Sequence, residues 1–201
     1  MDQRQGTLRD RKRRAVQDEV AGIAVDLFVA NGYEAMTVDQ IASAAGLSSR
    51  SFFRYFASKE AVVTHLFDTT GADIADALAA RPADEGPWVA LRRAFDGLIE
   101  QLTENPQSLA LIRMIHETPV LYASHLHKQT RWNEVVAATI APRLPESLRP
   151  DERRLQAGAL ASAGVACLEY ARQEWVARDG EHPMADLVDV AMRAVAPLAG
   201  P

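Results

Sequence analysis

The sequence predicts an all-α protein of about nine helices, in which an N-terminal three-helix head precedes a larger helical body. Apolar residues recur at three- and four-residue steps along most of the 201 residues, whereas the alternation typical of strands is hard to find. Aromatic residues make up only 6% of the chain, which also disfavours strands. Glycine (11) and proline (10) are scattered, so no long disordered tract is expected.

The first helix is expected from about Arg11 to Asn31. Asn31 and Gly32 form a pair suited to a left-handed cap at its end. The residues of its core stripe, spaced three and four apart, are Val16, Val20, Ile23, Ala24, Leu27 and Phe28.

Residues 37–60, TVDQIASAAGLSSRSFFRYFASKE, predict a helix, a tight turn and a second helix. Thr37 is placed to cap the first helix, and Gly46 stands where the chain must turn. Ser48 and Ser49 offer an N-cap for a second helix over Arg50 to Phe56. The apolar face of the first helix consists of Val38, Ile41, Ala42 and Ala45.

The second helix of this motif has the pattern of a DNA-reading helix. Phe52 and Phe56 share one face, and Phe53 is expected beside them. Polar and cationic side chains are expected on the other side, where arginine suits a bidentate bond to guanine. Ser48, Tyr55 and Lys59 are interpreted as phosphate contacts. The predicted DNA-binding set is Thr37, Ser48, Ser49, Arg50, Ser51, Arg54, Tyr55 and Lys59.

In and around this motif, over roughly the first quarter to third of the chain, the sequence resembles TetR-family transcriptional regulators. The resemblance implies a recognition helix in the major groove. Many members have a small residue in place of Arg50, and Tyr-His-Tyr-Phe in place of residues 53–56, so the operator sequence is not implied; the two arginines suggest G-containing half-sites. The matching residues are Phe28, Gly32, Tyr33, Thr37, Val38, Ile41, Ala42, Ala45, Gly46, Leu47, Ser48, Phe52, Tyr55, Phe56, Ser58, Lys59 and Glu60.

The body is expected to begin with a helix that Ser58 caps and that joins it to the head, ending near Arg81. A breaker-rich loop, PADEGP, follows. This division predicts a DNA-binding domain over residues 1–57 and a ligand-binding and dimerisation domain over residues 58–201. The remaining helices are expected over about Trp88–Glu104, then to Glu117, and over Val120–Leu144, Asp151–Arg178 and Met184–Leu198.

The charge of the chain divides between head and body. Residues 1–59 contain 9 Lys and Arg against 7 Asp and Glu, a balance of +2, whereas residues 60–201 hold 13 against 20, a balance of −7. Six of the nine basic residues lie between Arg4 and Arg14. This basic arm is expected to contact the DNA backbone or an adjacent minor groove; a solvated, frayed helix start is the alternative.

The composition also bears on compartment and assembly. One cysteine, Cys167, the absence of a signal peptide and the lack of a membrane-spanning run together predict a cytoplasmic protein without membrane contact. A helix-turn-helix reader of this size usually acts as a dimer on a palindrome. The last two helices, one rich in small residues, are the expected homodimer surface, as the family resemblance implies; ordinary core packing is the alternative.

The fifth to seventh predicted helices should enclose a cavity for a small, largely apolar effector. The predicted ligand-binding set is Trp88, Phe95, Arg113, His116, Tyr122, Trp132 and Trp175, with Leu98, Leu109, Met114 and Glu117 as further candidate lining residues. For each of them core packing is an equally good account. Residues 113–144, together with the FFRYF run, resemble TetR-like regulators with acyl-CoA-like ligands, which implies an acyl-type effector.

The function expected from these features is a ligand-responsive, sequence-specific regulator, most simply a repressor that its effector releases from DNA. The alternative is a DNA-binding regulator whose body binds a protein partner. An enzyme is a distant third, because HExxH, GxSxG and phosphate-loop motifs are absent. No cofactor or metal is expected: His125 and His127 point about 200° apart on a helix and cannot share a metal ion.

Overall fold

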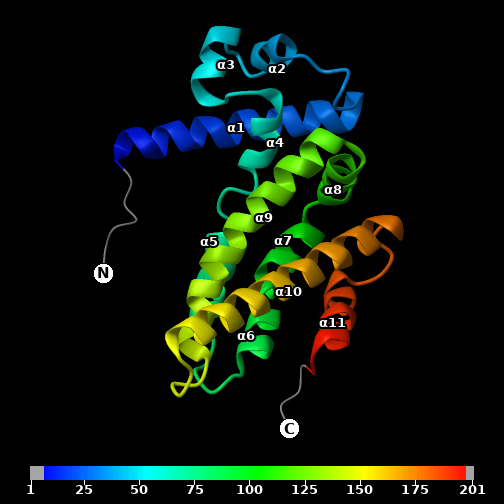
Figure 1. Cartoon of the computed structure of the whole chain (residues 1–201). Helices are drawn as coiled ribbons and strands as arrows, with labels where there is room; N and C mark the ends of the chain where they lie inside the picture. The colour runs from blue at the N-terminus through cyan, green and yellow to red at the C-terminus, as the bar shows by residue number, and fades with distance from the viewer. Residues whose placement is uncertain (1–6, 198–201) are drawn as a thin grey trace.

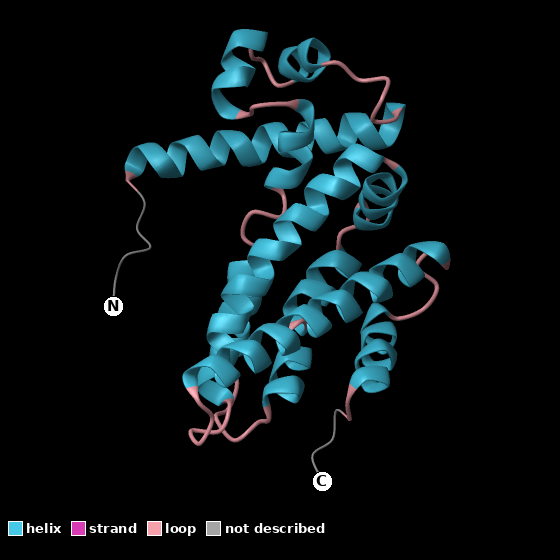
Figure 2. Cartoon of the chain, in the orientation of Figure 1, coloured by secondary structure: helices cyan, strands magenta, loops and turns pink. Residues whose placement is uncertain are grey.

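The computed structural model describes residues 7–197, which form eleven α-helices and one short 3-10 helix and contain no strand (Figures 1 and 2). The all-α prediction is confirmed. Two of the predicted helices are each interrupted once, and counting each interrupted pair as one element gives the nine helices expected from the sequence. Arg4 and Leu198, the outer limits of the predicted basic arm and of the last predicted helix, lie outside the described residues.

The head consists of α1 (Leu8–Asn31), α2 (Val38–Ala44) and α3 (Ser49–Tyr55). The first helix begins three residues earlier than predicted because Thr7 and Asp10 form a capping box at its start. It ends at Gly32, whose φ of +86° is easily adopted only by glycine. In Figure 1, α1 lies across the upper end of the body, and α2 and α3 lie on its far side.

The predicted fourth helix is two helices, α4 (Lys59–His65) and α5 (Thr70–Ala79), separated by a turn over residues 66–69. Ser58 caps α4 as predicted, its hydroxyl accepting a hydrogen bond from the Ala61 amide at 3.2 Å. The break has a packing reason. Helix α4 packs against both α1 and α9, whereas α5 packs chiefly against α9 and also contacts α6 and α7, and the turn lets the chain change direction between these contacts.

The body is built around two long helices, α9 and α10, that pack on each other, with α11 against α10 (Figure 1). The predicted helix over residues 88–104 is interrupted at Phe95, which is fully buried between α6 and α7. The bounds are α6 (Pro87–Ala94), α7 (Asp96–Glu104), α8 (Ser108–Glu117), α9 (Pro119–Ile140), the 3-10 helix η1 (Ala141–Arg143), α10 (Pro150–Ala177) and α11 (Met184–Val195).

The hydrophobic core continues from the head into the body. One cluster contains the head core and also Val62 of α4, Ile115 of α8 and Trp132 of α9. A second cluster lies deeper in the body among α5 to α11. Head and body are therefore joined through α4 by buried side chains. A movement of α4 relative to α9 would change the packing in both.

Candidate DNA-binding surface and interior polar cluster

The helix-turn-helix forms as its sequence predicts. Thr37 caps α2, and its backbone amide donates to the Gln40 side chain at 2.8 Å. Gly46 turns the chain with a φ of +66°. Ser48 then caps α3, accepting a hydrogen bond from the Ser51 amide at 3.1 Å. These local bonds set where α3 begins, and with it the direction in which its side chains point.

The two arginines of α3 are exposed. Arg50 and Arg54 are both open to solvent, and the Arg54 guanidinium carbon lies 5.2 Å from the centre of the Tyr55 ring. The guanidinium carbon of Arg13, from α1, lies 5.9 Å from the same ring. A surface cleft of about 840 Å³ is lined by the start of α1 together with Arg54 and Tyr55, and its cations include Arg9 and Lys12. The folded chain therefore brings the basic start of α1 next to α3.

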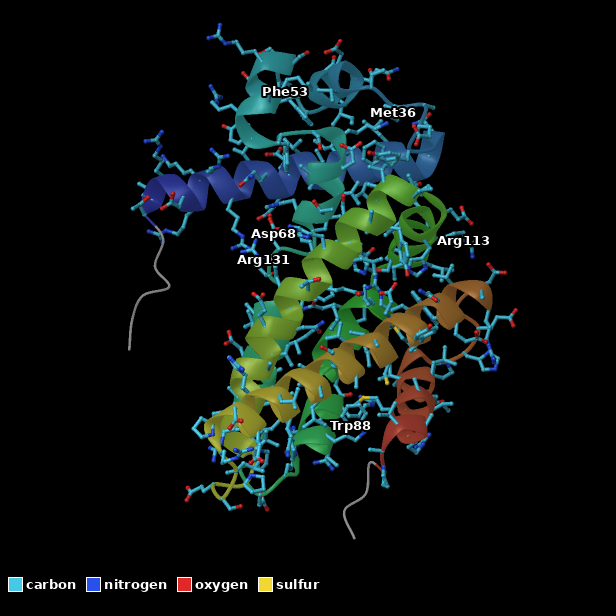
Figure 3. The ribbon with its side chains drawn as sticks, in the orientation of Figure 1. Met36, Phe53, Asp68, Trp88, Arg113 and Arg131 are labelled. Atoms are coloured by element: carbon cyan, nitrogen blue, oxygen red, sulfur yellow. The ribbon has the colours of Figure 1, made fainter. Side chains whose placement is uncertain are left out.

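Phe53 differs from the expectation for the apolar face of α3. Phe52 is fully buried, and Phe53 stacks edge-on against it with the ring centres 5.6 Å apart. The Phe53 side chain is nevertheless 56% exposed and lies at the outer end of the head (Figure 3). The buried face of α3 therefore consists of Phe52 and Phe56. The Phe53 ring lies on the exposed side of the helix, together with the serines and arginines.

Lys59 has a structural role that the sequence did not predict. Its ammonium donates to the backbone carbonyls of Tyr33 and Met36, at 2.8 and 3.1 Å, and lies 3.9 Å from the centre of the Tyr33 ring. The Tyr33 hydroxyl in turn donates to Glu60 at 2.6 Å. Two of the three N–H groups of Lys59 therefore hold the loop between α1 and α2, and one is left for the predicted phosphate contact.

A buried polar cluster lies inside the body between α8, α9 and α10. Its centre is Glu169, 6% exposed, whose carboxylate lies 2.9 Å from His116 Nε2 and 3.1 Å from His125 Nε2. The Gln129 amide donates to the same carboxylate at 2.7 Å. Arg172 Nη1 donates to it at 3.4 Å. We call the set His116, His125, Gln129, Glu169 and Arg172 the interior polar cluster.

The pKa values in this cluster reflect competition between burial and pairing. Burial alone would raise the pKa of Glu169, but the hydrogen bonds from His116 and His125 and the charge of Arg172 hold it well below its ordinary value. Burial lowers the pKa of His125 and also that of Arg172. Glu169 is therefore ionised at neutral pH and acts as the counter-charge of Arg172.

The cluster leaves some of its polar atoms unsatisfied. Among the described residues, Nε and Nη2 of Arg172 and Nδ1 of His125 are buried and have no hydrogen-bond partner. Buried polar groups in proteins nearly always have a hydrogen-bond partner, so these three atoms are exceptions that need a physical explanation.

The predicted ligand-binding residues divide between this cluster and other places. His116, Tyr122 and Trp132 gather there: the His116 and Tyr122 rings lie 5.5 Å apart, as do the His125 and Trp132 rings. Trp88, Phe95 and Trp175 lie in the second core cluster. The Trp88 indole nitrogen donates to the Ala196 carbonyl at 3.2 Å.

Arg113, labelled in Figure 3 on the outer side of α8, pairs with Asp179 at the protein surface. None of the seven predicted ligand-binding residues lines the apolar cavity described next. The four cluster residues that the sequence reading did not select are His125, Gln129, Glu169 and Arg172.

A cavity of about 380 Å³ lies between α5, α7 and α8. Leu98, one of the further candidates, lines it, as does Phe67 from the turn between α4 and α5. The Phe67 ring lies 5.4 Å from the His125 ring and 5.9 Å from the guanidinium carbon of Arg172. Phe67 therefore stands between the cavity and the interior polar cluster. Other apolar lining residues are Leu66, Ile74, Ala77, Leu102 and Leu111.

The described residues also bear on whether the chain has a metal site, a membrane-spanning helix or a reactive thiol. No group of three or more His, Cys, Asp or Glu side chains within residues 7–197 is placed to hold a metal ion. Across the same part of the chain, no helix has the length and apolarity needed to cross a membrane. Cys167 is buried, and burial raises the pKa of its thiol, which reduces its reactivity.

Comparison with protein families gives two matches. Residues 23–66 match the model described as bacterial regulatory proteins of the tetR family. Residues 85–199 match the model described as the MftR C-terminal domain. Together the two models cover the helix-turn-helix and most of the body.

Individual proteins agree with these matches. The HTH-type transcriptional regulator TcmR of Streptomyces glaucescens is 36% identical over 73% of this chain and 68% of its own. The putative mycofactocin biosynthesis transcriptional regulator MftR of Mycobacterium tuberculosis is 33% identical over 66% of this chain and 68% of its own. The fold resembles that of the transcriptional regulator FadR of Bacillus subtilis in complex with stearoyl-CoA. The TM-score is 0.62 at 14% identity, over 91% of this chain and 99% of that one.

Proposed function

Because the chain belongs to the TetR family of bacterial regulatory proteins, it is a DNA-binding transcriptional regulator and not an enzyme, and we propose that it represses transcription from a palindromic operator until a small acyl-type effector releases it. We place its action in the cytoplasm, where bacterial DNA lies. The observation that carries the DNA-binding part is the arrangement of α3, whose two arginines are exposed beside the basic start of α1.

In this proposal α3 enters the major groove. Arg50 and Arg54 read base edges, with guanine as their preferred partner. Thr37, Ser48 and Tyr55 contact phosphates together with the basic start of α1, and Lys59 does so through its remaining N–H group. Ser49 and Ser51 flank Arg50 on α3 and are proposed to face the groove, Ser49 while its hydroxyl donates to Asp39 of α2. The exposed Phe53 ring is suited to contact a thymine methyl group, which would add an A·T preference at one position.

The DNA-reading proposal is tested by selecting duplexes from a random library with the wild-type chain and with Arg54→Ala. The wild type should enrich a palindrome. The variant should lose about 1–3 kcal/mol on that palindrome and relax the base preference at one position in each half-site. An equal loss on all sequences would show that Arg54 contacts only phosphates.

A homodimer through α10 and α11 is the assembly we propose. On α10, Leu155 and Tyr170 are 73% and 70% exposed, and on α11 Val190 is 61% exposed. Small residues, Ala159, Ser162 and Ala166, lie on the exposed face of α10 between Leu155 and Tyr170. Large exposed apolar side chains on two adjacent helices favour burial against a second copy, and the small residues allow close approach.

The effector is proposed to occupy the cavity between α5, α7 and α8. Apolar side chains form the larger part of its wall, which also carries polar residues such as Asp73, Gln101 and Asn105, and its volume of about 380 Å³ is at the lower end of the range for small-molecule sites. An acyl chain suits such walls, and a neighbouring fold, FadR of Bacillus subtilis, was solved with stearoyl-CoA. Phe67 lines this cavity and also lies close to His125 and Arg172 of the interior polar cluster, which offers the polar contacts that pockets of this kind use for orientation.

Release from DNA would follow from the position of the turn over residues 66–69. His65, at the end of α4, lies 2.8 Å from Asp18 of α1 and 2.9 Å from Asp68 of the turn. Asp68, which is labelled beside Arg131 in Figure 3, also pairs with Lys128 of α9. An effector that moves this turn would change how α4 seats against α1, and so the spacing of the two recognition helices. It must bind the DNA-free conformation more tightly than the DNA-bound one.

The effector proposal is tested by adding lauroyl-CoA to the complex of the chain with its selected palindrome. Its short chain suits the cavity volume. We expect release at concentrations that leave the complex intact when free CoA is added instead. If native mass spectrometry of the purified chain repeatedly finds no small molecule and acyl-CoA leaves the complex intact, the alternative of a protein partner for the body is favoured.

A further inference from the structure

Within residues 7–197, one edge of a buried guanidinium in the body has no hydrogen-bond partner. Arg172 is 2% exposed, and its Nη1 lies 3.4 Å from Glu169. Among the described residues its Nε and Nη2 have no hydrogen-bond partner. The covalent geometry of arginine places the Nε and Nη2 hydrogens on the same edge of the planar group, pointing the same way. The two unpaired donors therefore form one fork that can receive oxygen.

The charges around these two donors determine which kind of chemical group can bind to them. Glu169 already provides the counter-charge of Arg172, and His116 and His125 share the same carboxylate. A second buried carboxylate on the free edge would leave an uncompensated negative charge in the interior, which is strongly unfavourable. An uncharged group with an oxygen acceptor satisfies both donors without that penalty.

Aromatic rings lie near the guanidinium and near the cluster that holds it. The Phe67 ring lies 5.9 Å from the guanidinium carbon, and the Trp132 ring packs on His125. Such a dry environment strengthens a hydrogen bond to a carbonyl and admits little competing water.

We propose that the Nε and Nη2 edge of Arg172 is the subsite for an uncharged carbonyl oxygen of the effector, the acyl carbonyl if the effector is an acyl thioester. The inference rests on the proposed function and adds to it the group that is recognised and the residue that recognises it. Glu169, His125 and His116 act as positioning residues: they hold the guanidinium so that its free edge faces away from the carboxylate.

Access to this edge links the subsite to the DNA-binding head. Phe67 separates the apolar cavity from Arg172 and belongs to the turn between α4 and α5. In this proposal, a carbonyl that passes Phe67 to reach Arg172 from the cavity displaces the Phe67 ring and shifts the turn that carries it. Carbonyl recognition and the movement of α4 are then one event, whereas an acyl chain that fills the cavity alone leaves Phe67 in place.

The test uses two probes that differ in one oxygen: lauroyl-CoA and S-dodecyl-CoA, a thioether of the same chain length without the carbonyl. Titration calorimetry on the full-length chain should show that the wild type prefers lauroyl-CoA by about tenfold or more, since hydrogen bonds to charged groups are the stronger kind. Arg172→Lys keeps the charge beside Glu169 and lacks the fork, so it should bind both probes alike, with the affinity that the wild type has for S-dodecyl-CoA.

The matched control is Arg178→Lys, at the end of the same helix, where the arginine pairs with Glu174 at the surface. This variant should keep the wild-type preference. A measurement on the wild type alone covers the case in which Arg172→Lys does not fold: the infrared band of carbonyl-¹³C lauroyl-CoA should shift, on binding, below its position in an aprotic solvent.

The possible outcomes separate this inference from the proposed function. Equal wild-type affinity for the two probes, or a bound carbonyl band at its aprotic position, overturns the Arg172 subsite and leaves the acyl effector standing. If the wild type binds neither probe, the proposal of an acyl effector is wrong, and the proposed Arg172 subsite is wrong as well.

Discussion

Replacing Glu169 by glutamine should be the most damaging single change in the body that alters no side-chain volume. The side chains of Glu169 and Arg172 are 7% and 3% exposed, so the substitution leaves an arginine charge buried without its partner. It also replaces one carboxylate oxygen by an amide nitrogen at a place where ring nitrogens of His116 and His125 and the donating amide of Gln129 converge. Breaking a buried pair on one side costs about 3–5 kcal/mol.

That loss is a large fraction of the roughly 5–15 kcal/mol that stabilises a domain, so urea unfolding will report it clearly. Protein concentration must be held fixed, because a dimer's stability depends on it. Glu174→Gln is the matched control: it lies on the same helix, is 48% exposed in its side chain, and pairs with Arg178, so it should lose no more than about 1 kcal/mol.

The double variant Glu169→Gln, Arg172→Met removes both charges and should recover much of the loss. If Glu169→Gln unfolds at the same urea concentration as Glu174→Gln, then Glu169 is not the counter-charge of Arg172, and the argument for an uncharged ligand group at the free guanidinium edge fails with it.

Because of Glu169 and His125, the free energy of unfolding of the wild-type chain should depend on pH. The pKa of Glu169 is lower in the folded chain than in the unfolded chain, so its contribution is complete above the ordinary carboxyl pKa of about 4.3 and is lost as the pH falls below it. The lowered pKa of His125 acts in the same sense below about 6.5. We expect urea midpoints to fall steadily from pH 7 to pH 4, and Glu169→Gln to flatten the acidic part of that profile.

Three further variants test the phosphate contact, the packing of α5 on α9 and the dimer surface. Lys59→Ala should lower the slope of log affinity against log salt by about one, measured by fluorescence anisotropy on the selected duplex; an unchanged slope would restrict Lys59 to its loop contacts. Gly71→Ala would place a Cβ 2.6 Å from the indole of the facing α9 tryptophan and should cost about 1–3 kcal/mol in urea unfolding, and a neutral effect would mean that α5 and α9 separate easily. Leu187→Asp combined with Val190→Asp should give monomers in sedimentation velocity and weak binding to palindromes, whereas dimers that persist would place the interface on other helices.

Much of the fold follows from local signals that the sequence displays. Thr37, Ser48 and Ser58 each cap the helix that follows them, and Gly46 turns the chain between α2 and α3. Such caps act within a few residues, so reading them requires no knowledge of tertiary contacts. The helix breaks at residues 66–69 and at Phe95 were not predicted, because neither place carries a glycine or proline and both arise from packing against several helices at once.

The interior polar cluster was not predicted from the sequence. His125 and Gln129 are one helical turn apart on α9, and Glu169 and Arg172 are nearly one turn apart on α10. Polar residues at these spacings within apolar helices were a usable signal. Which stripe faces which is decided only by the crossing of α9 and α10. The places of Trp88 on α6 and Trp175 on α10, both buried in the second core cluster, likewise depend on tertiary contacts that a single sequence does not display.

The central claim is that two copies of α3 read one palindrome together. In such a dimer the recognition helices contact the same face of the duplex about one helical turn apart. The most direct measurement is the affinity of the full-length chain for its selected palindrome and for the same duplex with about 5 base pairs, half a turn, inserted between the half-sites. The account predicts that the insertion reduces binding to the non-specific level. Equal affinity for the two duplexes would contradict it.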